Sequence, residues 1–185
     1  LQAMVEVAAR YANQDMLDEY TTRNNAAYVD LQEKFNEALV LLEQALEINN
    51  RVAYIWAKHG QVLRKLNRLE QALESYTRAV ELGNKCAWGW SGRGLTLRLL
   101  GYHEEARNSF KRAVDLDPTD VWYWYNYAEE LILQNDYELA LEILDEAISI
   151  TPQHAESWSK IGQCLRGLKQ MDEAIRAYRK AVDIL

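Results

Sequence analysis

Prolines and cysteines are scarce in this sequence, and each scarcity excludes a class of protein. Two prolines and eight glycines are too few for the many tight turns of an all-β fold. Cys86 and Cys164 are too few for a disulfide framework or a metal site, so we expect buried thiols in a reducing compartment. The composition therefore favours a helical, cytoplasmic protein that holds no cofactor and no metal.

Long apolar runs are also missing. No stretch approaches the roughly eighteen apolar residues of a membrane-spanning helix, so we expect no contact with a membrane. The first residues, LQAMVEVAAR, lack the basic region and apolar stretch of a signal peptide, and a start at Leu1 rather than Met suggests a fragment or a trimmed product. A net charge of −7, from 21 basic and 28 acidic side chains, argues against a general nucleic-acid binder.

What the sequence does contain is a repeat. Tryptophan recurs with a period of 34 residues, at Trp56, Trp90, Trp124 and Trp158. A small residue follows four positions after each one, at Gly60, Gly94, Ala128 and Gly162. Two further alanine columns keep the same period, at Ala72, Ala106, Ala140 and Ala174 and at Ala79, Ala113, Ala147 and Ala181. A fixed period of this length is typical of a repeat protein.

The period divides the chain into blocks. With position 1 at Ala53, the blocks are 53–86, 87–120, 121–154 and 155–185. One step back gives 19–52, a degenerate copy in which Thr22 replaces the tryptophan while Ala38, Leu42 and Ala45 keep their columns. Residues 1–18 fit no further copy, and their apolar spacing predicts an N-terminal helix that stacks on the array.

Each block predicts two helices joined by a short turn. Apolar residues recur at helical spacing in both halves of a block. Asn67, Gly101 and Asn135 share the turn column, and these residue types tolerate the left-handed conformation that ends a helix. Pro118 and Pro152 end the second helix. A single pair cannot bury both of its faces, so neighbouring repeats must stack.

The motifs WAKHGQVL, WSGRGLTL, WYNYAEEL and WSKIGQCL, followed by segments such as EQALESYTRAV, resemble the tetratricopeptide repeat over residues 19–185. The resemblance implies an all-α, right-handed α-solenoid of stacked antiparallel helix pairs, with about five units plus an N-terminal helix. It departs from the family pattern at His59, Arg93 and Tyr127, which replace the usual leucine. The Lys–Asn pairing of the family's carboxylate clamp is missing, so we do not expect a receptor for chaperone tails.

By the same resemblance, six columns of the first helices line a concave face. Position 2 holds aromatic side chains in four successive blocks, Tyr20, Tyr54, Trp88 and Trp122. The six columns hold three acidic residues and seven basic ones, namely Arg23, Lys58, Arg64, Lys65, Arg98, Lys160 and Arg166. Alternatively, the aromatics pack on the preceding second helix and the charges form an ordinary solvated face.

Two glycines lie beside this aromatic column. The repeat pattern does not explain Gly89 and Gly92, and we expect them to leave a depression beside Trp88. Alternatively, the two glycines have no role, and the protein tolerates the helix stability that they cost. In the segment VWYWYNY, Trp124 and Tyr127 are predicted to face the core, and Trp122 and Tyr123 are surplus aromatics that the core does not need. The candidate peptide-binding residues are Tyr54, Lys58, Arg64, Lys65, Trp88, Gly89, Gly92, Arg98, Trp122 and Asn126.

The functional prediction is a protein–protein interaction scaffold that binds a peptide segment or helix, acidic with an apolar anchor, in its concave groove. A structural docking or oligomerisation segment of a larger enzyme or assembly, which self-associates through its terminal repeats, is the alternative. Single-stranded RNA binding uses the same side chains, but the overall acidity opposes it. The histidines fall in three unrelated columns and no catalytic motif appears, so we expect no enzyme, no catalytic residues and no nucleic-acid partner.

Overall fold

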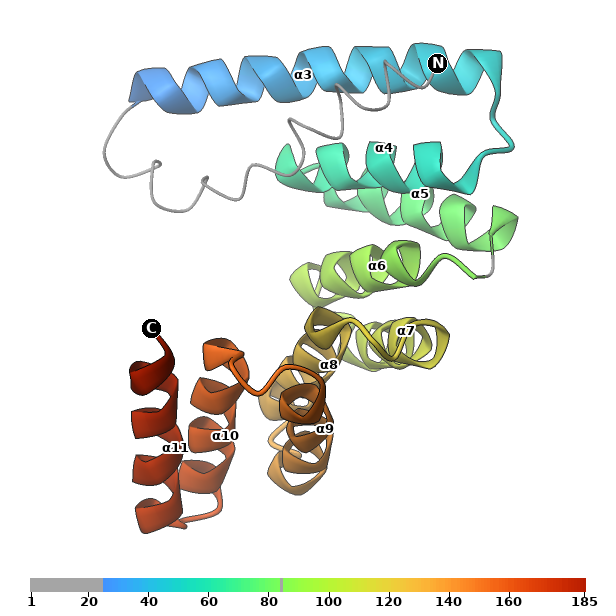
Figure 1. Ribbon diagram of the computed structural model, residues 1–185. Helices are drawn as coiled ribbons and strands as arrows, with labels where there is room; N and C mark the ends of the chain where they lie inside the picture. The colour runs from blue at the N-terminus through green and yellow to red at the C-terminus, as the bar shows by residue number, and fades with distance from the viewer. Residues whose placement is uncertain (1–24, 84) are drawn as a thin grey trace. The chain divides into compact units, whose positions relative to one another are not determined.

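A computed structural model describes residues 25–83 and 85–185, and all regular structure in these ranges is helical (Figure 1). The helices are α3 (Asn25–Ile48), α4 (Ala53–Lys65), α5 (Leu69–Leu82), α6 (Ala87–Leu99), α7 (His103–Leu116), α8 (Val121–Leu133), α9 (Tyr137–Ile150), α10 (Ala155–Gly167) and α11 (Met171–Ile184). The all-α class predicted from the sequence is confirmed. The helix predicted over residues 1–18 lies outside the described residues.

The chain forms two compact units, the first ending at Leu100 and the second beginning at Gly101. In the first unit α4 and α5 form a helix pair, α3 packs on α4, and α6 packs on both α5 and α4. In the second unit α8 pairs with α9 and α10 pairs with α11, while α7 packs on α8 and α9 on α10. Helices α5 and α9 therefore each lie between their own first helix and the first helix of the next repeat, as a stacked array requires.

The turns inside the pairs depend on a left-handed residue in one column. Asn67, Asn135 and Lys169 have φ of 58°, 61° and 62°, and Gly101 has φ of 82°. After each of these turns the chain enters a second helix, at Leu69, His103, Tyr137 and Met171. The first helices begin at Ala53, Ala87, Val121 and Ala155, which are the first residues of the predicted blocks.

The prediction of a helix pair in block 19–52 is wrong for the described part of that block. Residues 25–48 form one continuous helix, α3. Its residue in the turn column is Glu33, a good helix former with no preference for the left-handed conformation. An ion pair between Lys34 and Asp30, with 2.6 Å between Nζ and Oδ2, links neighbouring turns of the helix across this column. The helix therefore continues where the other blocks turn.

The recurring tryptophan fastens the loop that precedes its helix. The indole Nε1 of Trp56 donates a hydrogen bond to the carbonyl of Asn50 at 2.8 Å. Trp124 does the same to Pro118, at 2.9 Å, six residues upstream. Trp158 repeats the contact with the carbonyl of Pro152, also at 2.9 Å. Each of these indoles is half-buried, so the column combines packing with a fixed hydrogen bond to the inter-repeat loop.

The core follows the small and apolar columns. Ala38, Leu42 and Ala45 of α3 are fully buried, as the degenerate copy predicted. Tyr127 is buried as expected, but Tyr123 is buried as well, so its assignment as a surplus aromatic is wrong. Tyr123 occupies the column of Ile55, which is part of the apolar core that α3, α4 and α5 share.

Candidate functional site

The first unit holds a lysine enclosed by two aromatic rings. Lys58 lies one helical turn after Tyr54 on α4, and its ammonium nitrogen is 4.1 Å from the ring centroid of Trp88 and 5.5 Å from that of Tyr54. The two rings are 5.9 Å apart at an angle of 38°. These contacts assemble three of the predicted site residues from α4 and α6, and we refer to Tyr54, Lys58 and Trp88 as the lysine box.

The ammonium group of Lys58 is poorly compensated. The side chain is only 6% exposed, and its Nζ donates a long hydrogen bond of 3.3 Å to Oε1 of Gln61. No carboxylate of the described residues lies within ion-pair distance of it. Burial lowers the pKa of Lys58, because desolvation disfavours the charged form. Cation–π contact with Trp88 offsets part of this penalty.

The two aromatic rings differ in their exposure. Tyr54 is 49% exposed, while Trp88 is half-buried and packs against the small cluster of Ala57, Tyr76 and Ala79. Part of the position 2 column thus packs on the preceding second helix, which was the alternative interpretation.

The remaining basic candidate residues of the first unit, Arg64, Lys65 and Arg98, are half-buried. Lys65 lies seven residues after Lys58, on the same face of α4, and Arg98 lies near the end of α6. Arg64 is turned toward Tyr76: burial raises the pKa of Tyr76, and the neighbouring Arg64 guanidinium opposes this rise. Arg64 therefore contacts a buried tyrosine, and its binding role stays a prediction.

The expected depression over Gly89 and Gly92 is contradicted. Both glycines are buried. A Cβ on Gly92 would lie 2.2 Å from Cε1 of Tyr76, and one on Gly89 would lie 3.0 Å from Sγ of Cys86. The space beside Gly92 is thus filled by a ring from the preceding second helix. Packing against the Tyr76 ring explains Gly92, and neither buried glycine leaves an open depression for a partner's side chain.

Trp122 and Asn126 belong to α8, in the second unit. Trp122 is 47% exposed, as predicted for a surplus aromatic. Its ring meets that of His154 edge-on, with centroids 4.6 Å apart, and that of Tyr125 at 5.6 Å. Asn126 is half-buried on the same face of α8. These two residues are therefore set in an aromatic cluster that is distinct from the lysine box.

Sequence reasoning missed His154, which organises this cluster. Its Nδ1 accepts a hydrogen bond from the backbone N–H of Ser157 at 3.2 Å and so caps the start of α10. Burial lowers the pKa of His154, while the carboxylates of Glu156 and Asp120 act in the opposite direction. Its position directly before Ala155, the first residue of a block, could have identified it as the residue that caps the first helix of that block.

The second unit also holds the counterpart of Lys58. Lys160 occupies the same column, and its Nζ lies 2.8 Å from Oε1 of Glu129 on α8. Desolvation lowers the pKa of Lys160, but the hydrogen bond and charge of Glu129 outweigh it, so the net shift is upward. The two lysines share a register position, but among the described residues Lys160 has a carboxylate partner and Lys58 has none.

A second carboxylate in this unit is already used by the fold. Glu130 is fully buried, and its Oε1 lies 2.8 Å from Nδ1 of His103. His103 also accepts a hydrogen bond at its carbonyl from Gln134, at 3.3 Å. These contacts tie the start of α7 to α8, and we interpret them as structural.

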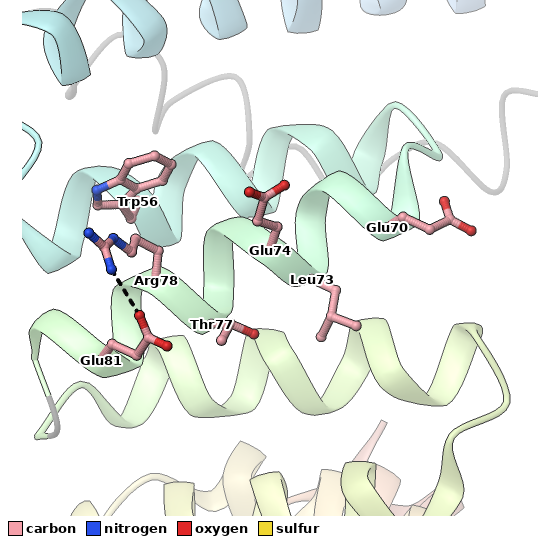
Figure 2. Close-up of a pocket in the computed structure, with 7 residues that line it drawn as sticks. All are labelled: Trp56, Glu70, Leu73, Glu74, Thr77, Arg78 and Glu81. Atoms are coloured by element: carbon pink, nitrogen blue, oxygen red, sulfur yellow. Dashed lines mark hydrogen bonds and ion pairs between the residues drawn. The ribbon is translucent and has the colours of Figure 1, made fainter.

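A pocket of about 520 Å³ lies over α5, away from the predicted site (Figure 2). Trp56 of α4 lines it together with side chains along α5, including Arg78 and Glu81, which form an ion pair of 3.1 Å. Trp56 is two residues from Tyr54, so the two side chains point to different sides of α4. The pocket contains no predicted site residue, and its carboxylates give it the opposite charge to the lysine box.

The described residues contain no group of three or more potential metal ligands close together. Within the same part of the chain, no helix combines the length and the apolar character that crossing a membrane requires.

Comparison with solved structures shows the fold. The crystal structure of MamA superimposes with a TM-score of 0.76 at 19% identity, covering 87% of this chain and 94% of that chain. MamA 41-end from Desulfovibrio magneticus RS-1 gives 0.75 at 15% identity, with 96% and 94% covered. YrrB, described as a TPR protein with an unusual peptide-binding site, gives 0.70 at 20% identity, with 90% and 89% covered.

No curated protein matches the sequence. Family models do match it. One model described as tetratricopeptide repeat covers residues 97–164 and 131–184, and a second with the same description covers residues 57–121. Together with the 34-residue period, the helix pairs and the likeness to solved repeat proteins, these matches show that the chain belongs to the tetratricopeptide repeat family.

Proposed function

We propose that this chain is a protein-interaction scaffold whose lysine box binds an acidic side chain of a partner protein. The observation that carries the proposal is the state of Lys58, a nearly buried residue whose ammonium lies beside Tyr54 and Trp88 with no carboxylate partner among the described residues. A buried charge without an ion-pair partner keeps part of its desolvation penalty, and an incoming carboxylate offsets that remainder. The proposal assigns no catalytic step to the chain.

The chemistry of the ligand follows from the neighbours of the box. A carboxylate that reaches Nζ of Lys58 gains a charge-assisted hydrogen bond, which contributes about 1.5–3 kcal/mol. Tyr54 offers an exposed ring next to it, and Leu99 is 58% exposed farther along the face of α6 that carries Trp88. An apolar anchor of the partner therefore packs against these rings and Leu99, rather than over Gly89 and Gly92.

The charges around the box favour an acidic segment rather than a single acidic residue. Lys65 lies on the same face of α4 as Lys58, and Arg98 lies near the end of α6. Half-buried basic side chains steer acidic segments and are screened over roughly 8–10 Å at physiological salt. In the second unit, we propose that Trp122 and Asn126 form a separate contact surface for a protein partner.

The test compares two lysines that occupy one column. Lys58→Met removes the ammonium and keeps most of the stem packing, and Lys160→Met is the matched control because Lys160 already pairs with Glu129. Proteins captured from the native source by wild type are identified, and peptides that tile them are titrated against all three proteins. Circular dichroism must first show the same helical content for each.

The expected result is loss of binding in Lys58→Met and retention in Lys160→Met. Replacement of Asp and Glu by Asn and Gln in the bound peptide should weaken binding to wild type and leave its weak binding to Lys58→Met unchanged. Equal affinity of all three proteins for the same peptides would show that the lysine box is not the binding site.

A further inference from the structure

Three aromatic side chains in the second unit pack against one another. Trp122 and Tyr125 lie one helical turn apart on α8, and His154 immediately precedes α10, which contacts α8. The ring centroids are separated by 4.6 Å between Trp122 and His154, 5.6 Å between Trp122 and Tyr125, and 5.8 Å between Tyr125 and His154. We refer to these three residues as the aromatic cluster. Because Trp122 is 47% exposed, the cluster presents part of an indole ring to solvent.

The first unit contains an example of what an indole ring in this column binds. Trp88 occupies position 2 of its block, as Trp122 does, and the ammonium of Lys58 from the preceding block lies 4.1 Å from its ring centroid. In the block before Trp122, the column of Lys58 holds Gly92, which carries no side chain. Within the described part of the chain, the cation–π contacts involve other rings than that of Trp122. The exposed indole therefore lacks the internal cation that its counterpart has.

Two carboxylates lie beside the aromatic cluster. Oε2 of Glu156 is 3.6 Å from Nε2 of His154, and the Glu156 side chain is 52% exposed. Asp120 accepts a hydrogen bond at Oδ1 from the backbone N–H of Trp122, at 2.9 Å, and so caps α8. Neither carboxylate forms an ion pair with a lysine or arginine of the described residues. The surface around Trp122 is therefore negatively charged.

The lysine next to the cluster does not neutralise Glu156. Lys160 follows Glu156 by four residues on α10, a spacing at which opposite charges pair on a helix. Its Nζ instead lies 2.8 Å from Oε1 of Glu129 on α8, and 5.8 Å from the ring centroid of Tyr125. The negative charge is therefore compensated on the Tyr125 side of the cluster and uncompensated on the side of Trp122 and Glu156.

The tautomer of His154 helps to hold Glu156 at the cluster. Nδ1 of His154 accepts a hydrogen bond from the backbone N–H of Ser157, so the proton of the neutral ring is on Nε2. His154 is only 7% exposed, and its buried Nε2 has no hydrogen-bond partner among the described residues. Oε2 of Glu156, at 3.6 Å, is just beyond hydrogen-bonding distance. A small movement of the exposed Glu156 side chain completes this bond and fixes the carboxylate beside the Trp122 ring.

We propose that the aromatic cluster and Glu156 form a binding site for an arginine side chain of a partner protein. This inference rests on the interaction role proposed above and gives the contact surface of the second unit its ligand. A planar guanidinium stacks on the exposed ring of Trp122 while its N–H groups reach the carboxylate of Glu156. A lysine ammonium is a point charge that cannot combine stacking with a forked hydrogen bond, so it fits less well. The site is thus opposite in charge to the lysine box.

The probe is an acetylated and amidated Gly-Arg-Gly peptide, and the matched peptides replace arginine by lysine or by citrulline, its uncharged analogue. Each is titrated into isotope-labelled protein, and the indole N–H resonance of Trp122, identified by its loss in Trp122→Phe, reports binding at the cluster. The proteins are wild type, Glu156→Gln and Glu142→Gln, which removes the same charge from an exposed position of α9. Lys58→Met and a Gly-Glu-Gly peptide test the lysine box separately. All variants must show wild-type circular dichroism.

The arginine peptide should shift the Trp122 resonance saturably, and the lysine and citrulline peptides should bind severalfold more weakly. Glu156→Gln should weaken binding of the arginine peptide severalfold, whereas Glu142→Gln and Lys58→Met should leave it unchanged. Equal affinity for arginine and citrulline, or an arginine affinity that Glu156→Gln does not change, overturns the proposal. Equal affinity for the lysine peptide overturns the assignment to arginine. Binding of the arginine peptide without binding of the glutamate peptide would reject the lysine box and support this site.

Discussion

Replacement of Gly92 by alanine should destabilise the protein, although alanine is the better helix former. The intrinsic gain from Gly→Ala in a helix interior is about 1 kcal/mol. Against it stands the new methyl group, whose carbon would lie 2.2 Å from Cε1, 2.4 Å from Cζ and 2.8 Å from Oη of Tyr76. Ordinary carbon–carbon contacts are about 3.5–4 Å, so the ring or the helix must move by more than an ångström.

The ring of Tyr76 has little room to retreat. It is 1% exposed, and on its other side the place of a Cβ on Gly60 is only 3.0 Å from the ring. Overpacking of this kind costs about 1–3 kcal/mol, and a shift greater than an ångström places Gly92→Ala toward the upper end. After the helix gain is subtracted, we expect the free energy of unfolding to fall by about 1–2 kcal/mol. Gly89→Ala should be close to neutral, because its nearest contact is the end of the Cys86 side chain at 3.0 Å.

Urea unfolding followed by far-ultraviolet circular dichroism measures both variants against wild type, provided that the slopes agree. The decisive comparison uses a Tyr76→Leu background, which removes the ring that the new methyl group meets. In that background Gly92→Ala should change sign and stabilise the helix. If Gly92→Ala is as stable as wild type, or destabilises equally with and without the Tyr76 ring, the packing explanation of Gly92 is wrong.

Three further predictions concern stability. Burial lowers the pKa values of His59 and His154 from 6.5, so the unfolded chain binds protons before the folded chain does as the pH falls. The free energy of unfolding should therefore decrease below about pH 6.5. His154→Asn should reduce the change of the urea midpoint between pH 7.5 and 5.5, and an unchanged pH dependence would count against this role of His154. Lys169→Gly should raise the thermal midpoint, because a left-handed residue other than glycine costs about 1–2 kcal/mol at φ of 62°; a lower midpoint would contradict the strain. Trp124→Phe should lose the hydrogen bond to Pro118 and about 1 kcal/mol in urea unfolding, and equal stability would show that this bond contributes nothing.

The sequence by itself determined the fold class and its register. A period of 34 residues places tryptophan, small residues and alanines in columns, and such columns are produced only when the same helix contacts recur along the chain. The starts of the first helices and the buried positions Ala38, Leu42 and Ala45 follow from these columns. Local turn chemistry also explains α3, since Glu33 stands where other blocks have Asn, Gly or Lys in a left-handed conformation, although the period alone suggested a helix pair.

Only the tertiary structure decided what each surface column does. Lys58 and Lys160 have the same register, yet Lys160 pairs with Glu129 of the neighbouring first helix, while Lys58 lies between two rings with no carboxylate partner in the described part of the chain. Gly92 seemed unexplained within its own helix because the group it accommodates, the ring of Tyr76, comes from the preceding repeat. Periodicity reports which positions are equivalent, whereas the environment of a side chain depends on residues 16 to 34 positions away that differ from one repeat to the next. For that reason the fold and the candidate positions Tyr54, Lys58 and Trp88 could be predicted from the sequence, whereas the burial of Lys58 beside two aromatic rings could not.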